Sequence, residues 1–274
     1  MQKIQLICFP YAGGSAGFFH GLKEELQDQV EVTAVEYAGH GIRRKESYYH
    51  TFEELVQDMT GMVREVRKPE VPYAILGYSM GSVVAYEVWK AYRRQGWELP
   101  VHMFVASHRP PHLPLQGNLN ADSSEEEVIE ALCNFGGMDP RLLENKRFLD
   151  LFTQPVKVDY GLLLQYQAAE VPEKVTCDLT AFYASEDLTG EEIRQWQGYT
   201  EGEFTQYEFP GKHFFLKGNE KPVGDVIREK LLHTPVNRHL LSQVTNDKIK
   251  LESCIEEEVR EKPKKRIKSR KEIL

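Results

Sequence analysis

The sequence predicts an α/β fold, in which a mostly parallel central sheet carries helices on both faces and is interrupted by one helical insertion. Short apolar runs alternate with amphipathic segments through the first hundred residues. This order is typical of parallel strands joined by helical crossovers. Between residues 113 and 169 the strand signal disappears and helix follows helix, after which strand character returns. The sheet is therefore expected to resume after the insertion.

The elements of the core follow one another along the chain. Short runs of apolar residues predict buried strands, whereas apolar residues spaced three or four apart predict helices. On this basis strands are expected at Ile4–Phe9, Val30–Val35, Tyr73–Leu76, Val101–Ala106, Leu179–Tyr183 and Phe204–Phe209, and helices at Phe18–Leu26, Phe52–Val66, Val83–Tyr92 and Pro222–His233.

The insertion is expected to hold three helices, each with a recognisable start. A serine followed three residues later by glutamate makes a capping box, and Asp-Pro suits an N-cap and first helical position. These signals place helices at Val128–Cys133 after Ser124 and Glu127, from Asp139-Pro140 through Lys146, and at Val156–Tyr166 after Gln154-Pro155.

The predicted domains follow from these elements. Residues 1–112 and 170–233 form the α/β core, residues 113–169 a helical lid insertion, and residues 234–274 a C-terminal helical and basic tail. Apolar residues three or four apart from Leu241 to Val259 predict a helix with a narrow apolar seam, ended by Pro263. The tail is interpreted as a partly helical extension, with a docking helix for a partner as the alternative.

Composition narrows the class of protein. A formal net charge of -8 over 274 residues argues against a nucleic-acid binder, because phosphate recognition needs a basic surface. The four cysteines are far apart and fit neither a disulfide framework nor a zinc site. The apolar run at the N-terminus is too short for a signal peptide, and no stretch approaches the roughly 18 apolar residues of a membrane span. We expect a cytoplasmic protein that binds neither nucleic acid nor membrane.

A nucleophile motif lies between a predicted strand and a predicted helix. Gly77-Tyr78-Ser79-Met80-Gly81 fits Gly-x-Ser-x-Gly, and Ala74-Ile75-Leu76 just before it is a buried-strand signal. This strand–turn–helix context is the one that the α/β-hydrolase fold requires of its nucleophilic serine. A chance glycine-rich turn is the alternative. Ser79 is therefore the predicted nucleophile.

Serine is a weak nucleophile without a neighbouring base that a third group orients. In this fold the acid and then the histidine follow the serine along the chain. His213 lies in a loop between the last predicted strand and the last helix, whereas His233 ends a helix and His239 lies in the tail. Asp187 follows the preceding strand and is the preferred acid, with Glu186 in reserve.

An oxyanion hole needs two preorganised N–H donors. Met80, the residue after the nucleophile, is expected to supply one of them. The other is expected from the loop after the first strand, Pro10-Tyr11-Ala12-Gly13-Gly14, where Ala12 is preferred and Tyr11 is the alternative. This loop lacks the lysine of a phosphate-binding P-loop, so that interpretation is weak.

Several further motifs occur together with the nucleophile turn. They are Phe9-Pro10-Tyr11-Ala12-Gly13-Gly14, Tyr37-Ala38-Gly39-His40-Gly41 followed by Arg43-Arg44, Ser107-His108-Arg109-Pro110-Pro111, Phe135-Gly136-Gly137-Met138 and Pro155-Val156-Lys157-Val158-Asp159-Tyr160. Over roughly residues 4 to 233 the chain resembles the type II thioesterases of nonribosomal peptide and polyketide assembly lines. His40 and Lys157 stand where that family usually has arginine.

The resemblance implies an enzyme that removes aberrant or stalled acyl groups from the phosphopantetheine arm of carrier proteins. It also implies a Ser79–His213–Asp187 triad that works through an acyl-enzyme and needs neither metal nor organic cofactor. Acylated peptidyl or acyl carrier domains are the implied partners. Arg43-Arg44-Lys45 and Arg109 are candidates for contact with an acidic carrier, although charge runs are usually solvated faces.

Two other functions remain open on the sequence. A chain-releasing acyl-carrier or acyl-CoA thioesterase, or a plain carboxylesterase, would use the same triad. A binding protein that has lost catalysis on this fold is the alternative from a different class, and the presence of Ser79, Asp187 and His213 argues against it.

Overall fold

The computed structural model describes residues 3–115, 119–120, 122–136 and 146–232. The chain divides into two compact units, Met1–Leu231 and Leu232–Leu274. Every element below belongs to the first unit, apart from the last residue of the final helix. The predicted tail helix, and the helix expected from Asp139 towards Lys146, start outside the described residues.

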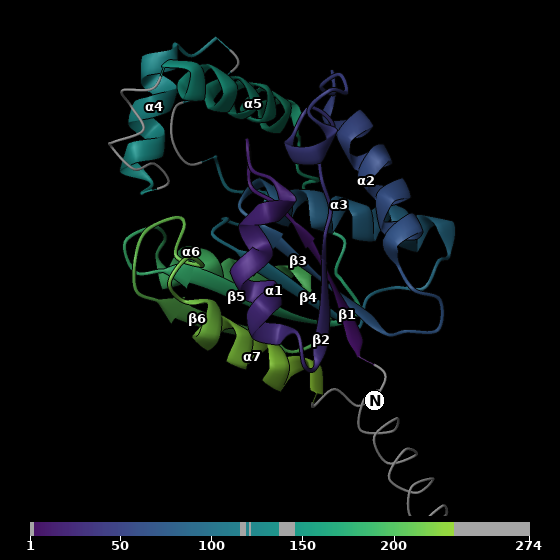
Figure 1. Ribbon diagram of the computed structural model, residues 1–274. Coiled ribbons are helices and arrows are strands. Elements are labelled where there is room, and N and C mark those ends of the chain that lie inside the picture. The colour runs from purple at the N-terminus through teal and green to yellow at the C-terminus, as the bar shows by residue number, and fades with distance from the viewer. Residues whose placement is uncertain (1–2, 116–118, 121, 137–145, 233–274) are drawn as a thin grey trace, which may run out of the picture. The chain divides into compact units, whose positions relative to one another are not determined.

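Six parallel strands form one sheet in the order β2-β1-β3-β4-β5-β6 (Figure 1). Each strand lies within one residue or two of its predicted bounds. They are β1 (Ile4–Phe9), β2 (Val30–Ala34), β3 (Tyr73–Tyr78), β4 (His102–Ala106), β5 (Asp178–Ala184) and β6 (Phe204–Phe209).

Helices join successive strands. The longer ones are α1 (His20–Leu26), α2 (Phe52–Val66), α3 (Met80–Gln95), α4 (Glu125–Asn134), α5 (Lys146–Gln165) and α7 (Glu220–Leu232), and the shorter ones are α6 (Gly190–Arg194) and the 3-10 turns η1 (Ala16–Phe19), η2 (Gly41–Arg43) and η4 (Gln195–Tyr199). The α/β-hydrolase fold predicted from the sequence is confirmed. No helix in the described ranges is long and apolar enough to span a bilayer.

The two faces of the sheet bury two separate cores. On one face the strands pack against α1 and α7, through side chains such as Leu22 and Ile227. On the other face they pack against α2 and α3, with Leu55 and Trp89 among the buried residues. This is the doubly covered arrangement expected of a parallel sheet, whose strands are buried on both sides.

Three predictions of secondary structure were wrong in detail. The helix expected from Val156 starts at Lys146 and continues through Pro155. A proline inside a helix removes only one backbone hydrogen bond, so it does not always end the helix. The segment predicted as one helix from Phe18 starts as a 3-10 turn, and helix α6 was missed although Thr189 and Glu192 form a capping box.

Candidate active site

Ser79 occupies a strained turn between β3 and α3. Its backbone angles are φ 52° and ψ -120°, a positive φ that only Glu70 and Ser107 share with it among the described non-glycine residues. Such a conformation is costly for a residue with a Cβ and persists only where the surroundings enforce it. The Ser79 N–H donates to the carbonyl of Ala106 at 2.7 Å, which ties the turn to the end of β4.

The two flanking glycines leave no room for a side chain. A Cβ on Gly77 would lie 2.2 Å from the carbonyl oxygen of Gly81, and a Cβ on Gly81 would lie 2.2 Å from that of Phe9. Both obstacles are backbone atoms, which cannot turn aside as a flexible side chain can. The close approach of β1, β3 and α3 thus explains why the motif has glycine at both positions.

The side chains of Ser79, His213 and Asp187 lie in hydrogen-bonding contact. His213 Nε2 is 2.9 Å from Ser79 Oγ, and His213 Nδ1 is 3.0 and 3.1 Å from the two carboxylate oxygens of Asp187. Glu186, the reserve candidate, is exposed. The geometry suits an imidazole that donates from Nδ1 to the carboxylate and accepts from the serine hydroxyl at Nε2.

Two buried hydroxyl groups hold the loop that carries His213. Tyr78 Oη donates to the His213 carbonyl oxygen at 2.6 Å, and Ser107 Oγ donates to the same oxygen at 2.8 Å. Sequence reasoning missed both residues. Tyr78 is a variable position of Gly-x-Ser-x-Gly, and Ser107 was noted only as the first residue of the Ser107-His108-Arg109-Pro110-Pro111 motif, without a role.

The candidate oxyanion loop is a tight turn after β1. The Gly14 N–H donates to the Tyr11 carbonyl at 2.8 Å, and the Gly13 N–H donates to Asp159 Oδ2 at 2.7 Å. Within the described part of the chain, the N–H groups of Ala12 and Met80 have no protein acceptor. The same holds for Tyr11, so the geometry leaves both loop candidates open.

A small cavity of about 30 Å³ lies beside Ser79 and His213. Leu115, Phe135 and Leu163 are among the side chains that line it. A water-sized site needs about 10–15 Å³ of such space, so the cavity has room for about two water molecules.

His108 also lines this cavity, one residue after Ser107. Burial lowers the pKa of His108 to about 4. The ring of His108 is therefore neutral at neutral pH and adds no positive charge beside His213.

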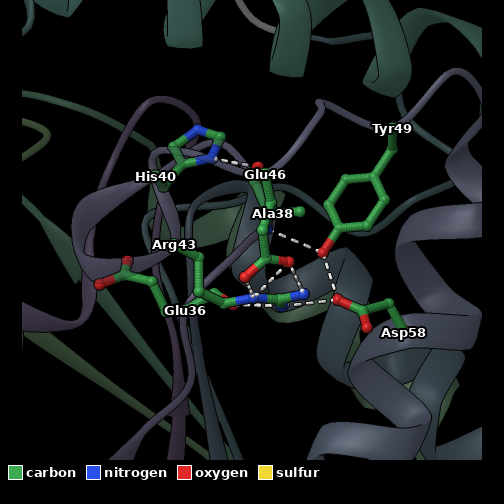
Figure 2. A network of polar contacts seen from close by, with 7 residues as sticks. All are labelled: Glu36, Ala38, His40, Arg43, Glu46, Tyr49 and Asp58. Carbon is green, nitrogen blue, oxygen red and sulfur yellow. Dashed lines mark hydrogen bonds and ion pairs between the residues drawn. The ribbon is translucent and has the colours of Figure 1, made fainter.

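Arg43 lies in a network of side chains within the protein, which Figure 2 shows. Its guanidinium donates to Asp58 at 2.7 Å, to the Glu36 carbonyl at 2.9 Å and to Glu46. Arg109 similarly pairs with Glu192 at 2.8 Å. Both arginines already have partners within this chain.

The chain is similar to known proteins in family and in sequence. The family model described as Thioesterase domain matches residues 4–231. The medium-chain S-acyl fatty acid synthase thioesterase of Rattus norvegicus is 31% identical over 217 residues, which covers 77% of this chain and 81% of that protein.

Two solved structures are similar at the level of both sequence and fold. The type II thioesterase BorB from the borrelidin biosynthetic cluster is 28% identical, with a TM-score of 0.73 and coverage of 83% of this chain and 92% of that one. ClbQ from the colibactin NRPS/PKS pathway is 26% identical, with a TM-score of 0.76 and coverage of 84% and 97%.

Proposed function

The chain belongs to the thioesterase domain family, and on that premise we propose that it hydrolyses aberrant or stalled acyl thioesters on the phosphopantetheine arm of carrier proteins in nonribosomal peptide or polyketide biosynthesis. The observation that carries this proposal is the contact of Ser79, His213 and Asp187 at the carboxyl edge of the sheet. The similarity to a protein of a colibactin NRPS/PKS pathway supports the choice of substrate class.

In the first half of the reaction, Ser79 Oγ attacks the thioester carbonyl while His213 Nε2 accepts the serine proton. Asp187 accepts from Nδ1 and stabilises the imidazolium that forms. The N–H groups of Met80 and Ala12 stabilise the oxyanion, an interaction whose loss typically costs about 10²–10³ in turnover. The tetrahedral intermediate then collapses, and His213 returns the proton to the departing thiolate.

In the second half, His213 takes a proton from a water molecule, which attacks the acyl-Ser79 ester. The second intermediate expels Ser79, the serine regains a proton from His213, and the acid product leaves. Each proton passes through one imidazole, so no other general acid or base is required.

The cavity beside Ser79 supports a short acyl group as the preferred substrate. About 30 Å³ suits a fragment as small as an acetyl group, and Phe135 and Leu163 are among the side chains that a longer chain would meet there. A medium-chain specificity like that named for the rat relative would therefore require the wall of the cavity to move.

The carrier domain is proposed to meet the loop after η2. Arg44 and Lys45 are exposed there, next to Ile42, which is 88% exposed. Arg43 anchors this loop through its own internal partners and is not expected to contact the carrier. Charge reversal at Arg44 and Lys45 together should raise KM for an acylated carrier without changing KM for a small acyl thioester.

Hydrolysis of a panel of acylated carrier proteins tests the proposal, with Ser79→Ala as control. We expect acetyl-carrier to be hydrolysed faster than octanoyl-carrier, and the alanine variant to lose about 10⁴-fold or more in kcat. Faster hydrolysis of oxygen esters than of any carrier thioester would favour a carboxylesterase instead. Failure of a fluorophosphonate probe to label Ser79 in the wild-type protein would favour a catalytically inactive binding protein.

A further inference from the structure

A buried carboxylate from the insertion contacts the candidate oxyanion turn. Asp159 lies on α5 and is 1% exposed. Its Oδ2 atom accepts from the Gly13 N–H at 2.7 Å and lies 3.0 Å from Nε2 of His40. Three segments that are distant in the sequence therefore meet at one carboxylate oxygen.

The contact at Gly13 restricts how the backbone of the neighbouring Ala12 can be oriented. Gly13 has a φ of 75°, and a Cβ there would lie 2.3 Å from Cγ2 of Val156, so the turn packs directly on α5. Ala12 is held between two constrained peptide groups, since Gly14 donates to the Tyr11 carbonyl on one side and Asp159 accepts from Gly13 on the other.

A third contact holds the residue that precedes the turn. Tyr37 Oη donates to the carbonyl of Pro10 at 2.8 Å. Tyr37 belongs to the segment that also carries His40, so the same segment supports both the start of the turn and the carboxylate that holds its middle.

His40 supplies the positive charge that a buried carboxylate needs. Figure 2 shows the contact of its Nδ1 with the Ala38 carbonyl, which is 2.9 Å long. Its Nε2 faces Asp159. The second contact is an ion pair rather than an aligned hydrogen bond. Because both ring nitrogens face oxygen atoms, the doubly protonated ring fits this position best.

Among the described residues, a second carboxylate and two tyrosine rings also lie around His40. Glu36 adds a further negative charge nearby, and the rings of Tyr37 and Tyr48 pack edge-on against the imidazole. Burial lowers the pKa of His40, but Asp159, the Ala38 carbonyl and Glu36 together raise this pKa above its ordinary value.

We propose that Asp159, paired with protonated His40, is a positioning residue that holds the Tyr11–Gly14 turn so that its free N–H can meet the oxyanion. The proposal rests on the proposed hydrolase function of Ser79. Asp159 does not touch the substrate in this scheme and acts only through Gly13. An uncompensated charge at Asp159 would be unfavourable in a buried site, so loss of the His40 proton should loosen the turn.

The sign of the pH effect follows from the direction of the pKa shift. A pKa raised in the folded protein means that the cation is present at low pH and is lost as pH rises through that pKa. Turnover should therefore decline on the alkaline side as His40 loses its proton. An arginine at this position would stay charged, and His40→Arg should abolish that alkaline decline.

The experiment measures p-nitrophenyl acetate hydrolysis and inhibition by methylboronic acid, which forms a tetrahedral adduct with the serine. The variants are Asp159→Asn, His40→Gln and His40→Arg. For Asp159→Asn and His40→Gln we expect kcat to fall about tenfold or more, the inhibition constant to rise in parallel and KM to stay within about threefold. A residue needed only for folding would lower the amount of active enzyme and leave the inhibition constant unchanged.

Glu87→Gln is the matched control. Glu87 pairs with Lys90 at 2.8 Å in another largely buried ion pair, on α3 and away from the turn. This variant should change thermal stability but neither kcat nor the inhibition constant.

Two results would overturn the proposal. One is an Asp159→Asn variant whose kcat and boronate inhibition constant both stay within twofold of the wild-type values. The other is an unchanged alkaline decline in His40→Arg. These readouts do not use a carrier protein, so a wild-type enzyme that cleaves the small ester but no acyl-carrier would refute the proposed substrate class and leave this test intact.

Discussion

Replacing Tyr78 with Phe and Ser107 with Ala, singly and together, tests how His213, the candidate catalytic histidine, is held. Both hydroxyl groups donate to the same buried carbonyl, that of His213, at 2.6 and 2.8 Å. Each single variant leaves the carbonyl with one donor. A buried neutral hydrogen bond contributes about 1 kcal/mol, so each single variant should lower the free energy of unfolding by about that amount.

The double variant should lose more than the sum of the two. With both donors removed, the carbonyl is buried without a partner, and such a group costs about 1–3 kcal/mol. Part of that cost is absent from either single variant. The coupling between the two positions should therefore be about 1 kcal/mol in excess of additivity, within the range seen for residues that share a partner.

Urea unfolding gives the stability of the four proteins, and kcat on acetyl thioester reports the position of the ring. If the imidazole is misplaced, the variants should rank in kcat as they rank in stability. Each 1.4 kcal/mol of lost transition-state stabilisation lowers kcat about tenfold. Strictly additive stabilities, or a double variant with wild-type kcat, would show that the two hydroxyl groups do not hold the histidine loop.

Three further predictions follow from the packing around the site. Gly81→Ala should abolish turnover and lower the melting temperature, because its Cβ would lie 2.2 Å from the Phe9 carbonyl oxygen; a fully active variant would contradict the close approach. Phe135→Ala and Leu163→Ala should raise the ratio of octanoyl to acetyl hydrolysis at least severalfold, and an unchanged ratio would show that these side chains do not limit acyl length. Burial lowers the pKa of His102 to about 3, below its unfolded value of about 6.5, so the protein should lose stability as the pH is lowered from about 6.5 to about 3. His102→Gln should flatten this pH dependence of the melting temperature. An unchanged slope would show that other groups cause it.

The sequence predicted the strands and the order of the site residues because both depend on local patterns. In a parallel sheet the carboxyl ends of the strands lie at one edge, so loops after separate strands converge there. Ser79, Asp187 and His213 follow β3, β5 and β6 in this way. The resemblance to type II thioesterases was confirmed by the family match and by the similar structures.

The supporting contacts could not be predicted, because they join residues that no local pattern relates. Tyr78 and His213 are 135 positions apart, and Gly13 and Asp159 are 146 positions apart. Nothing in a tyrosine at a variable motif position, or in an aspartate within a helical pattern, indicates such a partner. The sequence likewise left Asp187 and Glu186 both open as the acid, because neighbouring residues in a turn point in directions that only the folded chain defines.

The insertion contacts the candidate site at two places. Asp159 and Tyr160 are consecutive on α5: Asp159 accepts from Gly13 in the candidate oxyanion turn, and Tyr160 lines the cavity beside Ser79. If α5 moved away to admit a long acyl chain, it would also withdraw the carboxylate from Gly13. Long substrates would then react with a weakened oxyanion hole, and selection for short acyl groups would come from turnover as well as from fit. Trimming Phe135, the C-cap residue of α4, should enlarge the cavity without moving α5 and so admit longer chains with the turn still in place.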